Sequence, residues 1–465
     1  MAHPCYWHDS LATPPVAYSR LDGDIDADVV IIGAGFTGLW SAYYLGNADP
    51  SLRIVVLEAE QVGYGASGRN GGWLVGSMAG LDRYIDDWPL AKRQTVCDLL
   101  CRNVDDIGAV LEREGIEADY HKGGAVYVAA RYPAQEQVQR EYLAHLHHIG
   151  FRDEDCRWLD PDAMDRIGRF RDQRGGILQR QVATFHPVKL LHGLAARLVA
   201  RGVRLYEHSP VEETAPGLAR TRHGRVRARH VVTSTEGYTR HLGLKRHILP
   251  IESMLIATEP LSSMQWDEIG LAGRQAFGDA SRLVTYGQRS QDDRLIFGAQ
   301  GYYHFGGPAR AEFGISARHQ RMREGLLNAL FPGLGKVSIT HGWGGTLGLS
   351  RHFRPHAILD AETGMATAGG YAGEGAAMAH LMGQTLAELI TGQQTERTRM
   401  PWVHANARPA EVLKRWEPEP LRWVSAQAVA ASYGLEEAMM QRDLHVPGLS
   451  PALNAVNNAV SRMVE

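Results

Sequence analysis

The alternation of apolar and polar residues near the start of the chain predicts a strand, a tight turn, a helix and a second strand. Residues 28–32 read DVVII, a β-branched run of the length expected for a buried strand. Residues 33–45 carry glycines in G-x-G-x-x-G spacing and then apolar positions at helical intervals, and a second strand-like run, residues 53–57, ends at Glu58. Glycines and polar residues interrupt the uncharged stretch 29–45, so the pattern indicates a βαβ unit rather than a membrane span.

This unit has the chemistry of a dinucleotide-binding site. Gly33 permits the tight turn, Gly35 lets the backbone approach a pyrophosphate at the positive end of the helix, and Gly38 lets the helix pack on the strand. Glu58 is placed to accept hydrogen bonds from an adenosine ribose. The alternative is a turn whose glycines serve only packing, but it does not explain the acid at the end of the second strand.

A second glycine-rich stretch, residues 63–73 with the sequence GYGASGRNGGW, follows directly. Glycine has a high entropic cost on folding, so the cluster indicates that the backbone approaches a bound molecule rather than only reversing direction. A nicotinamide enzyme usually continues with alternating strands and helices after the acid, whereas this chain makes no early return to a parallel strand. The loop therefore favours FAD over NAD.

A third glycine loop lies near the other end of the chain. Residues 365–392, MATAGGYAGEGAAMAHLMGQTLAELITG, read as a strand, a glycine loop and a long helix. The amides at a helix amino terminus create a positive potential, which stabilises the negative charge at the N1–O2 edge of a reduced flavin. Capping of a core helix is the alternative, although four glycines before an uncharged helix start are hard to justify by packing alone.

The rest of the chain divides between two domains. Residues 185–206 read as a turn, an amphipathic helix and a strand that return to the nucleotide-binding domain. Strand-length runs elsewhere predict a mainly antiparallel sheet over the flavin. The expected fold is α/β, with a Rossmann-type FAD-binding domain and an interleaved, mainly antiparallel-sheet substrate domain. The expected boundaries are 1–75, 183–244 and 346–400 for the FAD-binding domain, 76–182 and 245–345 for the substrate domain, and 401–465 for a C-terminal helical extension.

Composition and charge narrow the classes of function. The 465 residues are 44% hydrophobic and 22% charged with a net charge of −3, which is ordinary for a folded protein and gives no general attraction to nucleic acid or to an anionic membrane. Period-two arginines around the turn at 223–224 could form a basic patch, but they more often mark the solvated face of a hairpin. The four cysteines lack metal-finger spacing, and no signal peptide is recognisable, so we expect no metal and a cytoplasmic protein. The arginines are Arg220, Arg222, Arg225, Arg227 and Arg229.

The stretch 28–38 and the later VVLEAEQVGYGASGRNGG resemble the amino-terminal signature of the D-amino acid oxidase-like superfamily of FAD-dependent amine and amino-acid oxidoreductases, and the γ-glutamylputrescine oxidase-like branch within it. The resemblance implies a two-domain layout and a third FAD-contacting segment at 229–239. It also implies noncovalent FAD, because the late cysteine or first-loop histidine that attaches flavin in some relatives is missing here. The sequence departs from the family at Ser234 and Glu236, where alanine and asparagine are common, and at Glu374, where many members of the branch have histidine.

The motifs and the resemblance together give the expected cofactor-binding residues. They are Gly33, Gly35, Phe36, Thr37, Gly38, Glu58, Ala59, Ser67, Gly68, Arg69, Asn70, Gly71, Gly72, Val211, Thr233, Gly369, Gly370, Tyr371, Gly373, Glu374 and Gly375.

Candidates for the substrate site are fewer. Trp343 and Arg351 lie in a glycine-containing stretch before the third glycine loop, where an aromatic wall and a cation would hold an amine bearing a carboxylate or phosphonate, although a surface loop is an equal alternative. Trp73, Tyr286 and Glu374 are further candidates by position.

The expected activity is FAD-dependent oxidation of an amine or amino-acid C–N bond to an imine, by hydride transfer to flavin N5, followed by hydrolysis, with oxygen as electron acceptor. An amine dehydrogenase with another acceptor, a flavin monooxygenase, a pyridine-nucleotide dehydrogenase and a flavin-binding structural or regulatory subunit without turnover remain alternatives. The sequence leaves the particular amine and the oligomeric state open.

Overall fold

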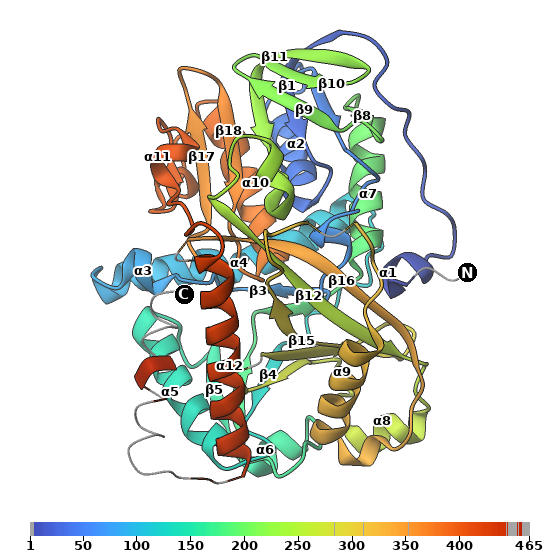
Figure 1. Cartoon of the computed structure of the whole chain (residues 1–465), viewed down its shortest axis with the longest axis vertical. Helices are drawn as coiled ribbons and strands as arrows, with labels where there is room; N and C mark the ends of the chain where they lie inside the picture. Colours follow the sequence, from blue (N-terminus) through green and yellow to red (C-terminus); the bar gives the residue numbers. More distant parts are fainter. Residues whose placement is uncertain are drawn as a thin grey trace.

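The computed structural model describes residues 4–282, 284–309, 311–351, 353–442, 444, 453 and 455–457. It consists of two lobes stacked along the long axis of the molecule, each built on one large sheet (Figure 1). Within the expected C-terminal extension, residues 443, 445–452, 454 and 458–465 lie outside the described residues.

The upper lobe is organised around β1 (Ile25–Ile32), the strand that the DVVII run predicts. Its neighbours are β2 (Ile54–Leu57) and β11 (Gly224–Thr233), both parallel to it, so β1 is an inner strand of the sheet. Side chains on both faces of β1 are buried, as is usual in a parallel sheet. The strand order is β19-β17-β18-β11-β1-β2-β8, and β9 and β10 form a hairpin with β11. The other strands are β8 (Arg204–Tyr206), β9 (Val211–Ala215), β10 (Leu218–Thr221), β17 (His356–Asp360), β18 (Met365–Gly369) and β19 (Val403–His404).

The alternating arginines lie on this hairpin. β10 and β11 pair in antiparallel fashion around the turn at 222–223, and Arg220 and Arg225 form exposed ion pairs with Glu213 and Asp24. The hairpin interpretation is therefore confirmed, and Arg220, Arg225 and Arg227 have acidic partners.

Two long helices cross on one face of the upper sheet. They are α2 (Phe36–Ala48), which follows the first glycine turn, and α10 (Gly375–Ile390), which follows the last glycine loop. A Cβ at Gly383 would lie 2.7 Å from the Cβ of Trp40, so glycine permits this close crossing. The other long helices of this lobe are α4 (Leu90–Glu114) and α7 (Pro187–Ala200).

The lower lobe contains an eight-stranded sheet of order β16-β12-β15-β14-β13-β4-β6-β5, in which only the β4–β13 pair is parallel. The expected α/β fold with a mainly antiparallel second sheet is thus confirmed. The strands are β4 (Ala125–Val128), β5 (Cys156–Leu159), β6 (Gly176–Gln179), β12 (Ile248–Thr258), β13 (Ala276–Asp279), β14 (Thr285–Arg289), β15 (Leu295–Tyr302) and β16 (Ile339–Ser350).

The two faces of the lower sheet have different neighbours because side chains alternate along each strand. Phe277 and Phe297 face outward and pack beneath α8 (Ser263–Ile269) and α9 (Ala317–Leu330). Tyr127 and Tyr286 belong to clusters on the opposite, inner face, which meets the upper lobe. Between the lobes, β3 (Trp73–Val75) pairs with β7 (Val182–Thr184).

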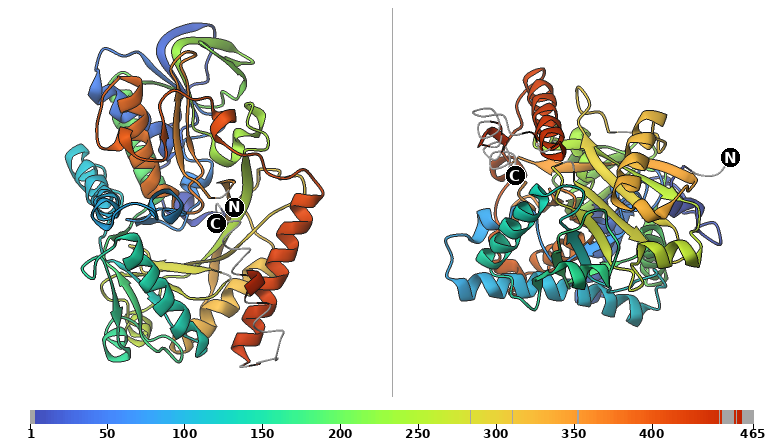
Figure 2. Two further views of the ribbon diagram at one scale, coloured as in Figure 1. Left: turned by 90° about the vertical axis from the view of Figure 1, so that its left-hand side faces the viewer. Right: turned by 90° about the horizontal axis from the view of Figure 1, so that it is seen from below.

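α12 (Leu421–Gln441) runs along the outside of the lower lobe, beside its sheet (Figures 1 and 2). Trp416 anchors the segment before α12, since its indole N–H donates to the Leu349 carbonyl at 2.9 Å. None of the described helices combines the length and apolar character needed to cross a membrane. The remaining helices are α1 (Tyr6–Asp9), α3 (Asp82–Ile85), α5 (Ala134–Ile149), α6 (Pro161–Asp165), α11 (Pro409–Val412), η1 (Ala66–Gly68), η2 (Glu236–His241), η3 (Pro332–Leu334) and η4 (Arg397–Arg399).

Candidate functional site

The first glycine turn closes tightly between β1 and α2. Gly33 has a φ of 102°, in the region that favours glycine, and a Cβ at Gly38 would lie 2.0 Å from the Gly33 carbonyl oxygen. Gly35 is the N-cap of α2 and offers no side chain to it, and the first turn of the helix has no acidic residue. This helix end is therefore suited to a bound anion.

Glu58 lies at the end of β2, beside this turn. Its carboxylate accepts hydrogen bonds from the backbone N–H groups of Ala34 at 2.7 Å and Glu60 at 3.0 Å. Burial raises the pKa of Glu58, and these two hydrogen bonds oppose the rise. The Ser209 N–H donates to the Glu58 carbonyl at 2.8 Å, so the segment that leads into Val211 and β9 runs alongside Glu58. The backbone that leads to Val211 therefore lies beside Glu58 in the upper lobe, as an adenosine site built from these two residues would need.

The loop 63–73 is held in place from several directions through its backbone carbonyl groups. The indole N–H of Trp7 donates to the Asn70 carbonyl at 2.7 Å, that of Trp343 to the Arg69 carbonyl at 3.0 Å, and the Gln288 amide to the Gly72 carbonyl at 2.9 Å. Trp343 is fully buried in these contacts. Trp343 therefore holds the loop from the side of β16.

The glycines of this loop also allow it to press against the lower sheet. Gly72 has a φ of 70°, and a Cβ at Gly71 would lie 2.9 Å from the ring of Tyr286. Ser67 joins the loop to the first glycine turn, because its hydroxyl accepts a hydrogen bond from the Phe36 N–H at 3.0 Å. A Cβ at Gly68 would lie 2.0 Å from the Gly63 carbonyl oxygen.

Arg69 is buried with one donor left over. Its guanidinium lies 3.3 Å from the centre of the Phe313 ring, its Nε donates to the Tyr64 carbonyl at 2.7 Å, and its side chain is 1% exposed. Nη2 has no hydrogen-bond partner in the described structure. A buried donor of this kind is costly unless a ligand supplies an acceptor.

The third expected FAD-contacting segment, residues 229–239, lies between the first glycine turn and the last glycine loop. Ser234 follows the last residue of β11, and its N–H donates to the Ile32 carbonyl at 2.9 Å, while the Thr233 carbonyl accepts from the Thr367 hydroxyl at 2.8 Å. The ends of β1, β11 and β18 therefore meet at one edge, where ligands of parallel α/β sheets bind.

The last glycine loop is bound by a carboxylate that the sequence analysis noted only as a departure from the family. Glu236 accepts hydrogen bonds from the N–H groups of Gly370 at 3.1 Å and Tyr371 at 3.3 Å. Burial raises the pKa of Glu236 to about 7, against the lowering effect of these hydrogen bonds. The hydroxyl of Tyr371 is in turn hydrogen-bonded to that of Thr37 at 3.0 Å. The first and last glycine motifs are thereby in direct contact.

Positive φ values recur along this loop, at 77° for Gly370 and 105° for Gly373. Glu374 is the N-cap of α10 but makes no side-chain cap, so the amides at the start of α10 remain available in the same way as those of α2. Gly369 lies against Glu236 and Gly375 against Tyr371, since a Cβ at either position would come within 3.1 Å of those side chains.

Trp73, Tyr127 and Tyr286 lie together near the junction of the lobes. Glu374, before α10, accepts a hydrogen bond from the Ser77 hydroxyl at 3.1 Å. The Trp73 ring centre is 6.3 Å from that of Tyr286 and 6.4 Å from that of Tyr127, both in edge-on geometry. The Tyr286 hydroxyl is hydrogen-bonded to that of Ser253 at 2.7 Å. Sequence reasoning missed Tyr127 because alternation along GGAVYVA shows that it shares a face with Ala125, but not that this face meets the upper lobe.

Arg351 has a different environment from the other substrate-site candidates. Its Nη2 donates to Glu417 at 3.2 Å, and its guanidinium lies 5.0 Å from the centre of the Trp416 ring. The structure therefore joins Arg351 to the C-terminal segment, and does not bring it together with Trp73, Tyr286 and Glu374.

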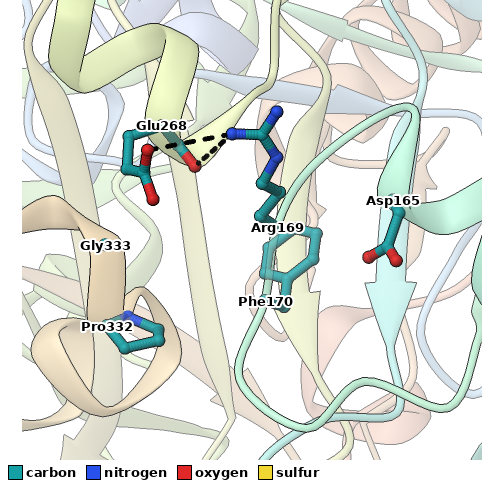
Figure 3. A pocket seen from close by; sticks show the side chains of 6 residues that line it. All are labelled: Asp165, Arg169, Phe170, Glu268, Pro332 and Gly333. Atoms are coloured by element: carbon teal, nitrogen blue, oxygen red, sulfur yellow. Dashed lines mark hydrogen bonds and ion pairs between the residues drawn. The ribbon is translucent and has the colours of Figure 1, made fainter.

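A separate surface cavity of about 300 Å³ lies at the outer side of the lower lobe (Figure 3). Arg169 lies across it, with its guanidinium donating to the carbonyl groups of Asp267 and Glu268. The cavity has no glycine loop or uncapped long helix, so it is not the nucleotide site. Its lining consists of Asp165, Arg169, Phe170, Glu268, Pro332 and Gly333. Among the described residues, no group of three or more His, Cys, Asp or Glu side chains is arranged to hold a metal ion.

These features fit a flavin dinucleotide. Two long helices start at adjacent glycine loops without side-chain caps, the Glu58 carboxylate lies beside the first of these loops, and the buried Nη2 of Arg69 needs an acceptor. A Cβ at Gly33, Gly35 or Gly38 would come within 2.8 Å of neighbouring atoms, so the turn has no room for larger residues.

Comparisons with known proteins agree with this site. The chain is 31% identical over 377 residues to a probable oxidoreductase, OrdL, of Haemophilus influenzae, covering 79% of this chain and 83% of the relative. It is 28% identical over 400 residues to the gamma-glutamylputrescine oxidoreductase of Escherichia coli, covering 84% and 89%.

Solved structures show the same fold. Glycine oxidase from Geobacillus kaustophilus superposes with a TM-score of 0.66 at 19% identity, covering 80% of this chain and 96% of that one. L-proline dehydrogenase from P. horikoshii superposes with a TM-score of 0.67 at 17% identity, covering 83% and 98%. The profile of the family described as FAD dependent oxidoreductase (DAO) matches residues 28–389. The resemblance inferred from the glycine motifs is confirmed, and the chain belongs to the DAO family of FAD-dependent oxidoreductases.

Proposed function

We propose that the protein oxidises the C–N bond of an amine through noncovalently bound FAD. The observation that supports the proposal most is the contact between the first and last glycine motifs through the hydroxyls of Thr37 and Tyr371. The loop 63–73 also presses against Tyr286, which packs with Trp73, so a dinucleotide bound at these loops would lie close to aromatic side chains.

The chain supplies the binding groups for FAD. The uncapped start of α2 would hold the diphosphate, Glu58 the adenosine ribose, the Val211 backbone the adenine, and the start of α10 the negative edge of the reduced ring. The loop 63–73 would run past the diphosphate and the ring, with its carbonyl groups already fixed by Trp7, Trp343 and Gln288. All four cysteines are buried, which supports noncovalent attachment.

Bound flavin supplies a two-electron acceptor: the carbon next to the amine nitrogen loses a hydride to N5, and water then hydrolyses the imine to a carbonyl compound and an amine or ammonia. Trp73, Tyr127 and Tyr286 exclude water from the reacting carbon. Their low polarity favours the neutral amine, the form that can lose a hydride.

Oxygen is the proposed electron acceptor, which would make the protein an oxidase that releases hydrogen peroxide. The fold does not decide this point, because a glycine oxidase and a proline dehydrogenase superpose almost equally well. The gamma-glutamylputrescine oxidoreductase among the relatives supports an amine as substrate.

The test is an anaerobic titration of the FAD-loaded protein with γ-glutamylated diamines, simple alkylamines, N-methylated amino acids and D-amino acids. We expect at least one amine to bleach the yellow flavin band, and admission of air to restore it with formation of hydrogen peroxide. A flavin band that no amine bleaches would favour a flavin-binding subunit without turnover. Bleaching that air does not reverse would identify a dehydrogenase.

A further inference from the structure

A short segment before β1, residues 5–10, is packed into the molecule at the level where the two lobes meet (Figure 1). It contains α1, and the side chains of Cys5, Tyr6 and Trp7 are at most 4% exposed. The residues that follow, 12–17, are exposed. A helix as short as α1 is not stable by itself, so the contacts of residues 5–10 hold the segment in place.

Two of these contacts are made with backbone carbonyl groups of the loop 63–73. The Trp7 indole N–H donates to the Asn70 carbonyl at 2.7 Å, and the Cys5 thiol donates to the Gly68 carbonyl over 3.7 Å. The Trp7 ring also lies against Gly72, because a Cβ at Gly72 would be 3.2 Å from it. The segment therefore contacts every second residue of the loop from 68 to 72.

The planarity of the peptide unit carries this contact to the other side of the loop. The Asn70 carbonyl and the Gly71 N–H belong to one trans peptide unit and point in opposite directions. Trp7 holds this carbonyl and therefore directs the Gly71 N–H away from itself. Loss of the indole donor would free the peptide unit to rotate.

Asn70 also links the segment to the start of α2. Its side-chain amide donates to the Ser67 carbonyl at 2.6 Å, and the Ser67 hydroxyl accepts from the Phe36 N–H at 3.0 Å, in the first turn of α2. Trp7 is thus connected through two loop residues to the helix end where the diphosphate of FAD is proposed to bind.

The segment is anchored in the lower lobe by two side chains. The Tyr6 hydroxyl donates to the Asp292 carboxylate, in the turn between β14 and β15. The Asp9 carboxylate is hydrogen-bonded to Nε2 of His341, on β16, at 3.1 Å.

A third anchor lies in the upper lobe, at the start of α7. Nδ1 of His186 accepts a hydrogen bond from the Lys189 N–H at 3.1 Å, so Nε2 carries the proton of the neutral ring and donates to the Ser10 hydroxyl at 3.0 Å. Burial lowers the pKa of His186 to about 4, which keeps the ring neutral at neutral pH. Residues 5–10 therefore join both lobes to the loop 63–73.

We propose that residues 5–10 form an amino-terminal clasp that positions the loop 63–73 for FAD, with Trp7 as the positioning residue. The inference rests on the proposed function, which places FAD beside this loop. Trp7 acts through the Asn70 carbonyl and requires no contact with the cofactor. Coupling between two binding events is reciprocal, so FAD also holds the clasp in place.

Trp7→Phe tests the clasp because it keeps an aromatic ring and removes the N–H donor. We expect the Kd of FAD, measured from the quenching of flavin fluorescence by the apoprotein, to rise about three- to tenfold. Trp416→Phe is the matched control, since Trp416 is 6% exposed and donates its indole N–H to the Leu349 carbonyl, outside the loop. The control should leave the Kd unchanged. An unchanged Kd in Trp7→Phe, or an equal rise in both variants, would overturn the proposal.

The visible circular dichroism of the bound flavin separates positioning from general stabilisation. At saturating FAD, we expect the spectrum of Trp7→Phe to differ from that of the wild type, and the spectrum of Trp416→Phe to match it. A wild-type spectrum in Trp7→Phe would show that Trp7 stabilises the fold without positioning the loop.

Tyr6→Phe provides the test if Trp7→Phe does not fold. It removes only the hydroxyl that reaches Asp292, and we expect it to weaken FAD binding about twofold. Wild-type affinity in Tyr6→Phe would then overturn the proposal.

Hydrogen exchange tests the coupling from the other side. The N–H groups of His8, Asp9 and Ser10 donate to carbonyl groups within the clasp, so their exchange reports its opening. FAD should slow this exchange by about the factor that Trp7→Phe adds to the Kd. The N–H groups of α12 are the reference, and equal slowing there would indicate general stabilisation and contradict the clasp.

The outcomes separate this inference from the proposed function. FAD binding that weakens in Trp7→Phe, together with a bound flavin that no amine reduces, would support the clasp and reject the proposed turnover. A flavin that an amine reduces, with the same Kd of FAD in Trp7→Phe and wild type, would support the turnover and reject the clasp. A wild-type protein that binds no FAD would reject both.

Discussion

Glu236 binds the backbone of the last glycine loop with a carboxylate whose pKa is raised to about 7 by burial. In the unfolded chain the group titrates near its ordinary pKa of 4.5, so between these values the folded protein holds more protons at this site than the unfolded chain. Stability therefore falls as the pH rises through this window, by on the order of 3 kcal/mol from this group.

We expect Glu236→Gln to remove this contribution. Unfolding of the FAD-free protein in denaturant, measured from pH 4.5 to 8, should show the variant gaining stability relative to wild type as the pH rises. His356, whose pKa burial lowers to about 4, contributes in the opposite direction but equally in both proteins. Parallel curves for the two proteins would show that Glu236 does not titrate in this range.

Gly38 tests the first glycine turn, because a Cβ there would lie 2.0 Å from the Gly33 carbonyl oxygen. We expect Gly38→Ala to shift the turn, to destabilise the protein by about 1–3 kcal/mol or more, and to lower its FAD content. Gly46→Ala in the same helix is the control, since the nearest atom lies 3.9 Å from the added Cβ. Full FAD occupancy in Gly38→Ala would refute the assigned role.

The strand–loop–helix units could be predicted because their signals are local. Glycine spacing and the change from strand to helix periodicity define β1 with α2 and β18 with α10 in the sequence itself. The partners of these loops could not be predicted, because they depend on long-range packing. Trp343, a substrate-site candidate by sequence, donates to the Arg69 carbonyl, a contact that arises only when β16 meets the upper lobe.

Register explains what else sequence reasoning missed. Tyr127 lies on β4, whose pairing with β6 and β13 sets which of its side chains lie on the inner face of the lower sheet. Glu236 begins a short 3-10 helix, and its partners Gly370 and Tyr371 are more than 130 residues away. The pairing of Arg351 with Glu417 could not be predicted either, because the two residues are distant in sequence.

The helix α12 is attached to the lower lobe by buried charges. Arg131 pairs with Asp279 and with Glu437 of α12, and all three side chains are at most 7% exposed. Arg131→Met would leave two buried carboxylates without a cation, so we expect a loss of about 3–5 kcal/mol. The free energy of unfolding in urea measures it.

Arg102→Met is the matched control for this prediction. Arg102 pairs with Glu396 at 3.2 Å on the surface, where both side chains are more than 40% exposed. Exposed pairs contribute about 0–1 kcal/mol. Equal losses in the two variants would show that the buried network does not stabilise the attachment of α12.

The whole molecule is assembled around the proposed FAD site from segments that lie far apart in the sequence. The loops after β1, β2, β11 and β18 meet at one edge of the upper sheet, and the loop 63–73 also packs against Tyr286 of the lower sheet. At the proposed site FAD would contact both lobes and would stabilise only the folded state. At a free concentration 100 times its Kd, FAD should stabilise the protein by about 2.7 kcal/mol, measured as a rise in melting temperature that Gly38→Ala lacks.

The most direct measurement is a crystal structure of the FAD-loaded protein. The account predicts the diphosphate at the start of α2 and the flavin ring between the loop 63–73 and the start of α10. A diphosphate bound elsewhere, or a flavin ring turned away from the lower sheet, would contradict it.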